Sequence, residues 1–264
     1  MQSSFLILSL NSGVVIPGCA AMDVAPSTVS GYLDPTYWEE RFSSEEHYEW
    51  LKDYSHFRHL LTPLLSPSLS VLELGCGNSR LSEELRQEGV ADITCIDLAS
   101  AAVERMKSRL SEKGISGIKV LVADMLDLPF QPETFDLVIE KGTMDVLFVD
   151  CGDPWNPNPT NVSKVMKMLE GIHKVLKQDG VYISISFGQP HFRRKFFEVP
   201  NFTWSVEYDK FGDGFHYFFY ILKKGKRSLD YEKNQNIPSE MPSINLFQEE
   251  LEGEDFLFRM VEDL

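Results

Sequence analysis

Residues 68–79 have the sequence SLSVLELGCGNS, a short apolar run that ends in a glycine-rich turn. The run has the length and composition of a buried strand. Gly75 and Gly77 follow it, where the backbone must turn sharply or approach a ligand closely. A helix over residues 80–87 is expected next, because Gly89 then supplies a helix stop. This order is typical of the first unit of an α/β sheet that binds a ligand at the turn.

The alternation of strands and helices continues on both sides of this unit. A helix is predicted to end at Pro63, before it. Further strands are predicted over residues 92–97, 119–123, 135–140 and 181–187, with helices over residues 99–113 and 162–176 and a turn at Asp179-Gly180. Two late strands, residues 203–208 and 215–222, are joined by Gly212-Asp-Gly and form a hairpin. We therefore expect an α/β fold with a doubly wound, seven-strand, Rossmann-like sheet, mostly parallel, with an antiparallel C-terminal hairpin.

The two ends of the chain differ in composition from its middle. Residues 1–30 carry a short apolar run without the basic start of a signal peptide, so a disordered N-terminal extension is expected. Residues 227–264 form a polar linker and an acidic segment that is predicted to end in a short helix. The predicted domain therefore spans residues 31–226, and no stretch has the length of a membrane-spanning helix.

The net charge indicates which kinds of partner suit the chain, and the cysteines indicate the redox compartment. The formal net charge is −15, which disfavours nucleic acid as a direct substrate and suits a basic protein partner. The four cysteines are scattered without a Cys-x-x-Cys pair, so neither a zinc site nor a disulfide framework is expected: Cys19, Cys76, Cys95 and Cys151. Reduced thiols indicate a reducing compartment such as the cytoplasm. We expect a monomer that binds no metal and no membrane.

Chemistry-bearing side chains follow the predicted strands. Asp97 ends the second strand, about twenty residues after the glycine turn, where an acid accepts hydrogen bonds from ribose hydroxyls. Asp124 and Met125 follow the third strand, where an acid and an apolar side chain can hold an adenine ring by its edge and face. Glu140 ends the fourth strand. Ligands of such sheets bind at the carboxyl ends of the strands, so these residues are expected to share one site.

Two other nucleotide-binding patterns fit less well. A dinucleotide fingerprint requires a third glycine at the start of the helix, and Arg80 stands at that position. A pyrophosphate also requires free backbone N–H groups at that helix start. A phosphate-binding P-loop is excluded, because no Gly-Lys-Ser/Thr follows the turn.

Four segments resemble the successive motifs of class I S-adenosylmethionine-dependent methyltransferases: VLELGCGNSRLSEEL, CIDLA, ADMLDLPF and FDLVIEKGTMD. Other segments are similar to those of the eukaryotic elongation factor 1-alpha lysine methyltransferases: YWEERF, LGCGNS, DPW, PHFR and GFHYFFYILKKG. The resemblance spans roughly residues 32–226. It implies S-adenosyl-L-methionine as the cofactor and protein-lysine N-methylation, with elongation factor 1-alpha as the partner.

The resemblance also implies a set of cofactor contacts: Trp38, Phe42, Trp50, Gly75, Asp97, Leu98, Asp124, Met125 and Lys141. The family often has tyrosine where Phe42 stands, so a hydroxyl contact is lost at that position. Trp38 and Trp50 fit the role of ordinary core aromatics equally well. No metal site is implied.

The acceptor side of the site is less defined by sequence. A lysine acceptor must lose its proton before it can react, and we hypothesise that Glu140 or Asp145 contacts the acceptor amine. Aromatic side chains are expected to line its channel: Phe187, Phe192, Tyr217 and Phe219. The proline-rich insertion over residues 150–161 either rims the acceptor site or is a plain surface loop. The fourth strand lacks the Asn/Asp-Pro-Pro-Tyr motif that holds planar nitrogens, which leaves an aliphatic amine or an oxygen as the acceptor.

Two other functions remain open at this point. The strand-end motifs do not define the acceptor, so a small-molecule methyltransferase is the first alternative. A non-catalytic domain that binds the cofactor and a protein partner is the second. The intact Gly75, Gly77, Asp97 and Asp124 argue against the second alternative, because a decayed enzyme does not need all four.

Overall fold

The computed structural model describes Pro26 and residues 28–227. Most of the predicted N-terminal extension and the predicted acidic tail with its helix lie outside the described residues. The extension was predicted to reach residue 30, but η1 (Val29–Leu33) already begins before that point. The backbone N–H of Gly31 bonds to the carbonyl of Thr28 at 2.9 Å and closes the first turn of η1.

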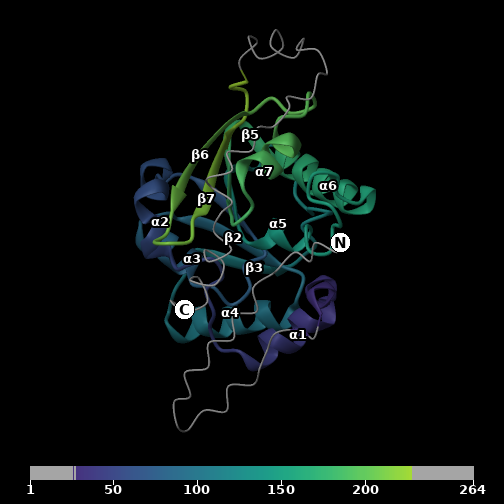
Figure 1. Cartoon of the computed structure of the whole chain (residues 1–264). Helices are drawn as coiled ribbons and strands as arrows, with labels where there is room; N and C mark the ends of the chain where they lie inside the picture. Colours follow the sequence, from purple (N-terminus) through teal and green to yellow (C-terminus); the bar gives the residue numbers. More distant parts are fainter. Residues whose placement is uncertain (1–25, 27, 228–264) are drawn as a thin grey trace, which may run out of the picture. The chain divides into compact units, whose positions relative to one another are not determined.

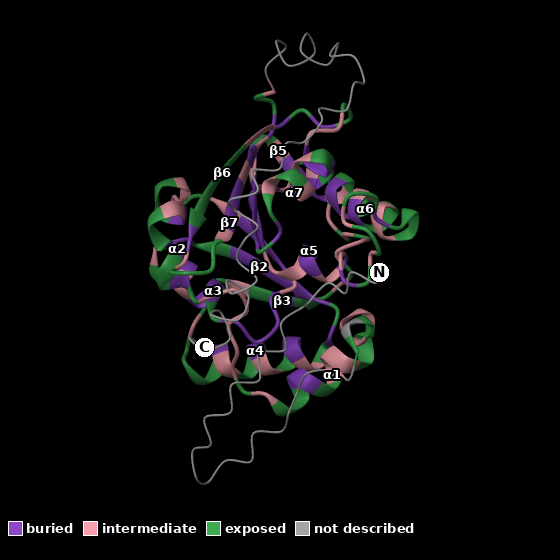
Figure 2. Ribbon diagram, in the orientation of Figure 1, coloured by how far each residue is buried: buried purple, intermediate pink, exposed green. Residues whose placement is uncertain are grey.

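A seven-stranded sheet forms the centre of the fold (Figure 1). Its strands are β1 (Ser70–Leu74), β2 (Asp92–Asp97), β3 (Ile118–Val122), β4 (Phe135–Lys141), β5 (Leu176–Ser186), β6 (Ser205–Phe211) and β7 (Tyr217–Lys223). Their order is β3-β2-β1-β4-β5-β7-β6, with the first five parallel and β7 antiparallel to both of its neighbours. The predicted fold class is therefore confirmed. β7 lies inside the sheet, so β6 alone is the edge strand on that side, and Figure 2 shows its exposed surface.

Helices cover both faces of this sheet, because the side chains of each strand alternate between two apolar layers. Val71 points into the layer under α2 (Tyr54–Leu61), α3 (Leu81–Gln87) and α4 (Ser100–Glu112). Leu72 points into the layer under α5 (Thr143–Val146), α6 (Pro159–Val175) and α7 (Pro190–Phe197). A 3-10 turn, η2 (Thr62–Leu64), connects α2 toward β1. α1 (Pro35–Ser44) packs outside α4, where Phe42 meets Ala99 and Ala102.

Three α-helices and several strand boundaries differ from the prediction, with the largest difference at the start of β5. α1, α5 and α7 were not expected, although α1 and α7 each begin with a proline in the first turn, which is a helix-start signal. β5 begins at Leu176, so the predicted turn at Asp179-Gly180 is wrong. The carbonyl of Gly180 accepts from the N–H of Lys224 at 2.9 Å, and the register with β4 shifts nearby. Long-range pairing overrides the local turn signal there.

None of the helices in the described part of the chain is both long enough and apolar enough to cross a membrane.

Candidate functional site

The glycine turn after β1 is enclosed by side chains from two other elements. Gly75 has φ +61°, and a Cβ there would lie 2.4 Å from the side chain of Thr143. Gly77 has φ +50°, and a Cβ there would lie 3.0 Å from the ring of Phe42. The Thr143 hydroxyl donates to the carbonyl of Leu74 at 3.0 Å, which fixes the start of α5 against the turn. Only glycine fits these two backbone conformations without strain.

Asp97 joins the end of β2 to this turn. Its carboxylate accepts from the backbone N–H of Gly77 at 2.8 Å and from that of Ala99 at 2.9 Å. Burial raises the pKa of Asp97, and the backbone N–H bonds oppose that shift. An ionised carboxylate has more acceptor positions than these bonds use, so Asp97 can still accept a hydroxyl from a ligand.

The predicted adenine contacts meet at the same edge of the sheet. β2 and β3 pair Asp97 with Val122, and the N–H of Ala123 donates to the carbonyl of Asp97 at 3.0 Å. This pairing brings the two residues after each strand together. Leu98 is 53% exposed, Met125 is half-buried and Asp124 is exposed. An exposed apolar side chain beside carboxylates suits a planar ring with a polar edge.

Aromatic side chains from α1 and the segment after it cover the glycine turn. Trp38 stacks on Phe42 with ring centroids 5.6 Å apart and meets Trp50 edge-on at 5.7 Å. Arg41 lies over the Trp50 ring at 4.8 Å. Both tryptophans are half-buried, which differs from a core position. The indole N–H of Trp38 donates to the carbonyl of Tyr32, whereas Trp50 Nε1 is buried and has no partner within the described residues. A buried donor of this kind is usually satisfied by a ligand or by water.

Glu49 is a candidate site residue that the sequence did not reveal. It accepts from Lys141 Nζ at 2.9 Å, from the Ser79 hydroxyl at 2.8 Å and from the N–H of Arg80 at 2.7 Å. Lys141 Nζ also donates to the carbonyl of Trp50 at 2.6 Å. These contacts tie the Trp50 segment to the glycine turn and to the end of β4. An acid directly before a tryptophan, in a stretch rich in aromatic residues, is the only sequence signal.

The backbone that follows Glu49 and Trp50 is strained. Leu51 and Lys52 have φ values of +61° and +108°, which non-glycine residues rarely adopt. Strain of this type persists where surrounding contacts fix the segment, and it concentrates at ligand sites. The Lys141 and Glu49 contacts supply that fixation.

Glu140 and Asp145 lie together but face protein donors. Glu140 is fully buried and accepts from the N–H groups of Thr143 and Met144 and from the Ser184 hydroxyl. Burial raises the pKa of Glu140 to about 7, with the nearby Asp145 as a further cause. The Asp145 carboxylate accepts from Arg193 Nη2 at 2.6 Å and from the Ser186 hydroxyl. Neither carboxylate is open to an acceptor in this conformation, so the geometry favours positioning roles, and contact with the amine stays a prediction.

The four aromatic residues expected around the acceptor lie in two different places. Phe219 is fully buried in the apolar layer under α2, and Tyr217 packs against the same layer. Their positions on β7 direct both side chains to that face of the sheet and away from the loop after β5. Phe187 is 40% exposed directly after β5, and Phe192 is half-buried in α7. Only Phe187 and Phe192 therefore lie beside the loop that connects β5 to α7.

Glu73 carries a testable pH dependence. Burial raises its pKa to about 8, whereas an unfolded chain releases this proton near its usual pKa of about 4. The folded state holds the proton more tightly, so the Glu73 contribution to the free energy of unfolding is complete below about pH 4 and is lost as the pH rises through about 8. We expect the urea midpoint to fall over this range, and to fall less in Glu73→Gln.

Glu104→Gln, on the exposed side of α4, is the matched control, because Glu104 forms a surface ion pair with Lys107. Equal pH slopes of the urea midpoint in wild type and Glu73→Gln would contradict the assignment.

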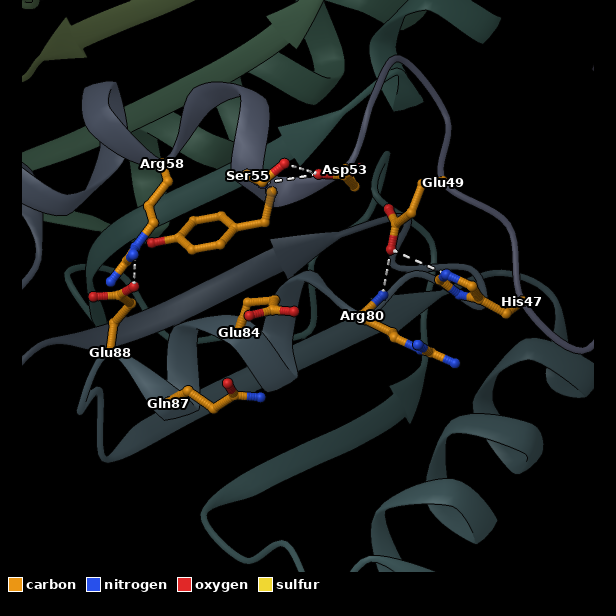
Figure 3. A pocket seen from close by; sticks show the side chains of 10 residues that line it. His47, Glu49, Asp53, Ser55, Arg58, Arg80, Glu84, Gln87 and Glu88 are labelled. Atoms are coloured by element: carbon orange, nitrogen blue, oxygen red, sulfur yellow. Dashed lines mark hydrogen bonds and ion pairs between the residues drawn. The ribbon is translucent and has the colours of Figure 1, made fainter.

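A surface hollow of about 600 Å³ lies between α2, α3 and the segment that precedes α2. Figure 3 shows Glu49 and His47 at one side of it and the Arg58–Glu88 ion pair at the other. Its charged lining comes from α2 and α3 and from the residues that precede each of these helices. Glu49 is its only residue that also contacts the glycine turn and Lys141 through its side chain.

Comparisons with known proteins match the part of the chain that forms the sheet. The family model described as "Methyltransferase domain" matches residues 65–227. The chain is 34% identical to the EEF1A lysine methyltransferase 4 of Bos taurus, over 88% of this chain and 93% of that protein. It is 30% identical to the eEF1A lysine and N-terminal methyltransferase of Homo sapiens, over 66% of this chain and 24% of that protein.

Solved structures share the fold at low identity. A structure from work on the conversion of a disulfide bond into a thioacetal group during echinomycin biosynthesis has a TM-score of 0.57 and 15% identity, over 76% of this chain and 96% of that chain. The PH0226 protein of Pyrococcus horikoshii OT3 has a TM-score of 0.50 and 15% identity, over 65% of this chain and 89% of that chain.

Proposed function

The chain belongs to the methyltransferase-domain family, with S-adenosyl-L-methionine as its methyl donor, and from that premise we propose that it methylates a lysine of translation elongation factor 1-alpha. The observation that carries the proposal is the 34% identity to EEF1A lysine methyltransferase 4, which extends over 93% of that relative. A shared fold alone does not define an acceptor. A match across nearly the whole length includes the acceptor side as well as the cofactor side.

The residues at the strand ends fit this donor. Gly75 and Gly77, which have no Cβ atom, lie in the turn beside the Asp97 carboxylate, and Leu98 is exposed next to it. Trp50 Nε1 is a buried donor with no partner in the part of the chain that the structure describes. Asp97 would hold the ribose hydroxyls, and Leu98 and Met125 would hold the adenine faces. Asp124 would bind the adenine edge, and Trp50 would donate to the amino-acid end of the donor.

The protein's main contribution to the reaction is alignment. The bound donor would supply a methyl group on a sulfonium, from which a neutral thioether is a good leaving group, so positioning the acceptor in line supplies much of the rate. The acceptor lysine must be neutral, and burial of its ammonium lowers its pKa. Glu140 and Asp145 accept backbone hydrogen bonds from the segments after β4 and β5, and thereby shape the acceptor side.

Methyl transfer to purified elongation factor 1-alpha tests the proposal. We expect label from S-adenosylmethionine on a lysine of that protein, found by mass spectrometry, and no label with the Asp97→Ala variant. Intact donor binding without label on elongation factor 1-alpha would contradict the proposed acceptor. Transfer to a small amine in the same assay would favour the small-molecule alternative.

Other properties of the chain belong to the same proposal. We propose a cytoplasmic location, supported by the free thiols of Cys76, Cys95 and Cys151. We propose a monomer that binds its acceptor protein directly and does not use nucleic acid as a substrate, supported by the formal net charge of −15.

A further inference from the structure

The loop between α5 and α6 is held in one shape by its own contacts. The N–H of Asn158 donates to the carbonyl of Cys151 at 2.8 Å, and Gly152 forms a bridge with Pro157. Lys195 Nζ, from α7, donates to the carbonyls of Pro154 and Trp155 at 3.0 Å each. The loop is therefore fastened to α7 at its tip.

This fixed loop presents a tryptophan to solvent. Trp155 is 65% exposed, which is the largest exposure among the large hydrophobic side chains that the structure describes. Its ring stacks on His191 with centroids 5.3 Å apart and meets Phe192 edge-on at 5.0 Å. These contacts fix the orientation of the indole while much of its surface remains exposed. A rigid, exposed tryptophan is the side-chain type that most often anchors a protein interface.

The aromatic cluster of Trp155, His191 and Phe192, which we call the platform, lies next to the acceptor side of the site. His191 and Phe192 open α7, which begins a few residues after β5 ends at Ser186. The following residue, Phe187, is 40% exposed and donates its N–H to Asp145 at 3.3 Å. The platform thus borders the carboxyl end of β5, the edge of the sheet where ligands of this fold bind.

The charge around the platform selects its partner. Asp150 and Asp153 are exposed on the same loop. Lys195, on α7, is a cation close to these residues, and its ammonium is already bonded to two loop carbonyls. The adjacent Arg194 is paired with Glu198. Burial lowers the pKa of His191, so its imidazole is neutral near pH 7. An aromatic face with carboxylates beside it attracts a cationic side chain by cation–π and charge interactions.

We propose that Trp155, His191 and Phe192, with Asp150 and Asp153, form a docking platform for a basic segment of the acceptor protein that lies next to the methylated lysine. This inference rests on the proposed function and adds to it the surface that selects the acceptor. A lysine or arginine of that segment lies on the exposed indole of Trp155, and the loop carboxylates neutralise its charge.

Steady-state kinetics with purified elongation factor 1-alpha tests the platform. In Trp155→Ala we expect KM for the protein acceptor to rise about tenfold, as at an interface anchor, with kcat within about twofold of wild type. Trp155→Lys is expected to raise KM further, because its ammonium repels a basic segment. The dissociation constant for S-adenosylmethionine and the melting temperature should stay at wild-type values in both variants. Tyr208→Ala is the matched control, since Tyr208 is also an exposed aromatic residue, at 45%, but lies on the edge strand β6.

The outcomes separate the two proposals. Wild-type methylation with unchanged KM in both Trp155 variants overturns the platform and leaves the proposed function in place. Absence of wild-type methylation overturns the proposed function and the platform with it. A wild-type dimer in sedimentation that Trp155→Ala dissociates shows that a second copy of the chain occupies the platform, which also overturns the assignment.

Discussion

Replacing Asp97 with alanine is expected to weaken S-adenosylmethionine binding by about 100-fold or more and to abolish measurable methyl transfer. The variant removes the acceptor for the N–H groups of Gly77 and Ala99 and leaves both donors buried without a partner. Each charge-assisted hydrogen bond lost in this way costs about 1.5–3 kcal/mol. The ribose contact is lost in addition. Isothermal titration calorimetry measures the binding effect directly.

Two further variants show whether the loss of affinity comes from the Asp97 carboxylate. Asp97→Asn keeps the shape but has one carbonyl oxygen in place of two, so we expect an intermediate loss of about tenfold. Asp127→Ala removes an exposed acid from the loop after β3 and should leave affinity unchanged. Wild-type affinity in Asp97→Ala would show that the turn is held by other contacts.

Replacing Arg193 with methionine is expected to lower the free energy of unfolding by about 3–5 kcal/mol. Arg193 and Asp145 form an ion pair at 2.6 Å with side chains only 4% and 5% exposed, and the guanidinium lies 3.8 Å over the Phe148 ring. Removal of the cation leaves a buried carboxylate without its counter-charge. Urea denaturation followed by fluorescence gives the change.

The double variant Asp145→Asn/Arg193→Met should recover part of this loss, because it removes the unpaired charge. Lys119→Met is the control, since the Lys119–Asp92 pair is exposed and such pairs contribute about 1 kcal/mol or less. A loss of the same small size in Arg193→Met would mean that the buried pair contributes nothing beyond a surface pair.

The elements that the sequence predicted well are those with strong local signals. β2 was predicted with its observed bounds, Asp92–Asp97, because it is a short apolar run between polar turns. The glycine turn followed from Gly75 and Gly77, whose positive φ values the structure confirms. By contrast, the irregular start of β5 depends on its pairing with β4 and β7, which no local pattern encodes.

The sequence predicted the site residues that directly follow strands. It did not predict the contacts between segments that are far apart in the sequence. Parallel strands place their ends at one edge, so Asp97 and Asp124 could be assigned to one place from their positions alone. Glu49 reaches Lys141 across 92 positions of sequence, and only the folded chain shows that contact. Similarly, burial decides that Glu140 and Asp145 bond to protein donors, and the sequence carries no direct measure of burial.

The interior position of β7 has a consequence for the order in which the chain acquires its structure during synthesis. β7 bonds on one side to β5 and on the other to β6, although it is the last strand in sequence among the described residues. Until residues 217–223 leave the ribosome, β5 has an unpaired edge and β6 has no neighbour in the sheet. Such an open edge can pair with other chains. We therefore expect the nascent protein to depend on chaperones until β7 is made, and truncation before Tyr217 to give aggregated protein.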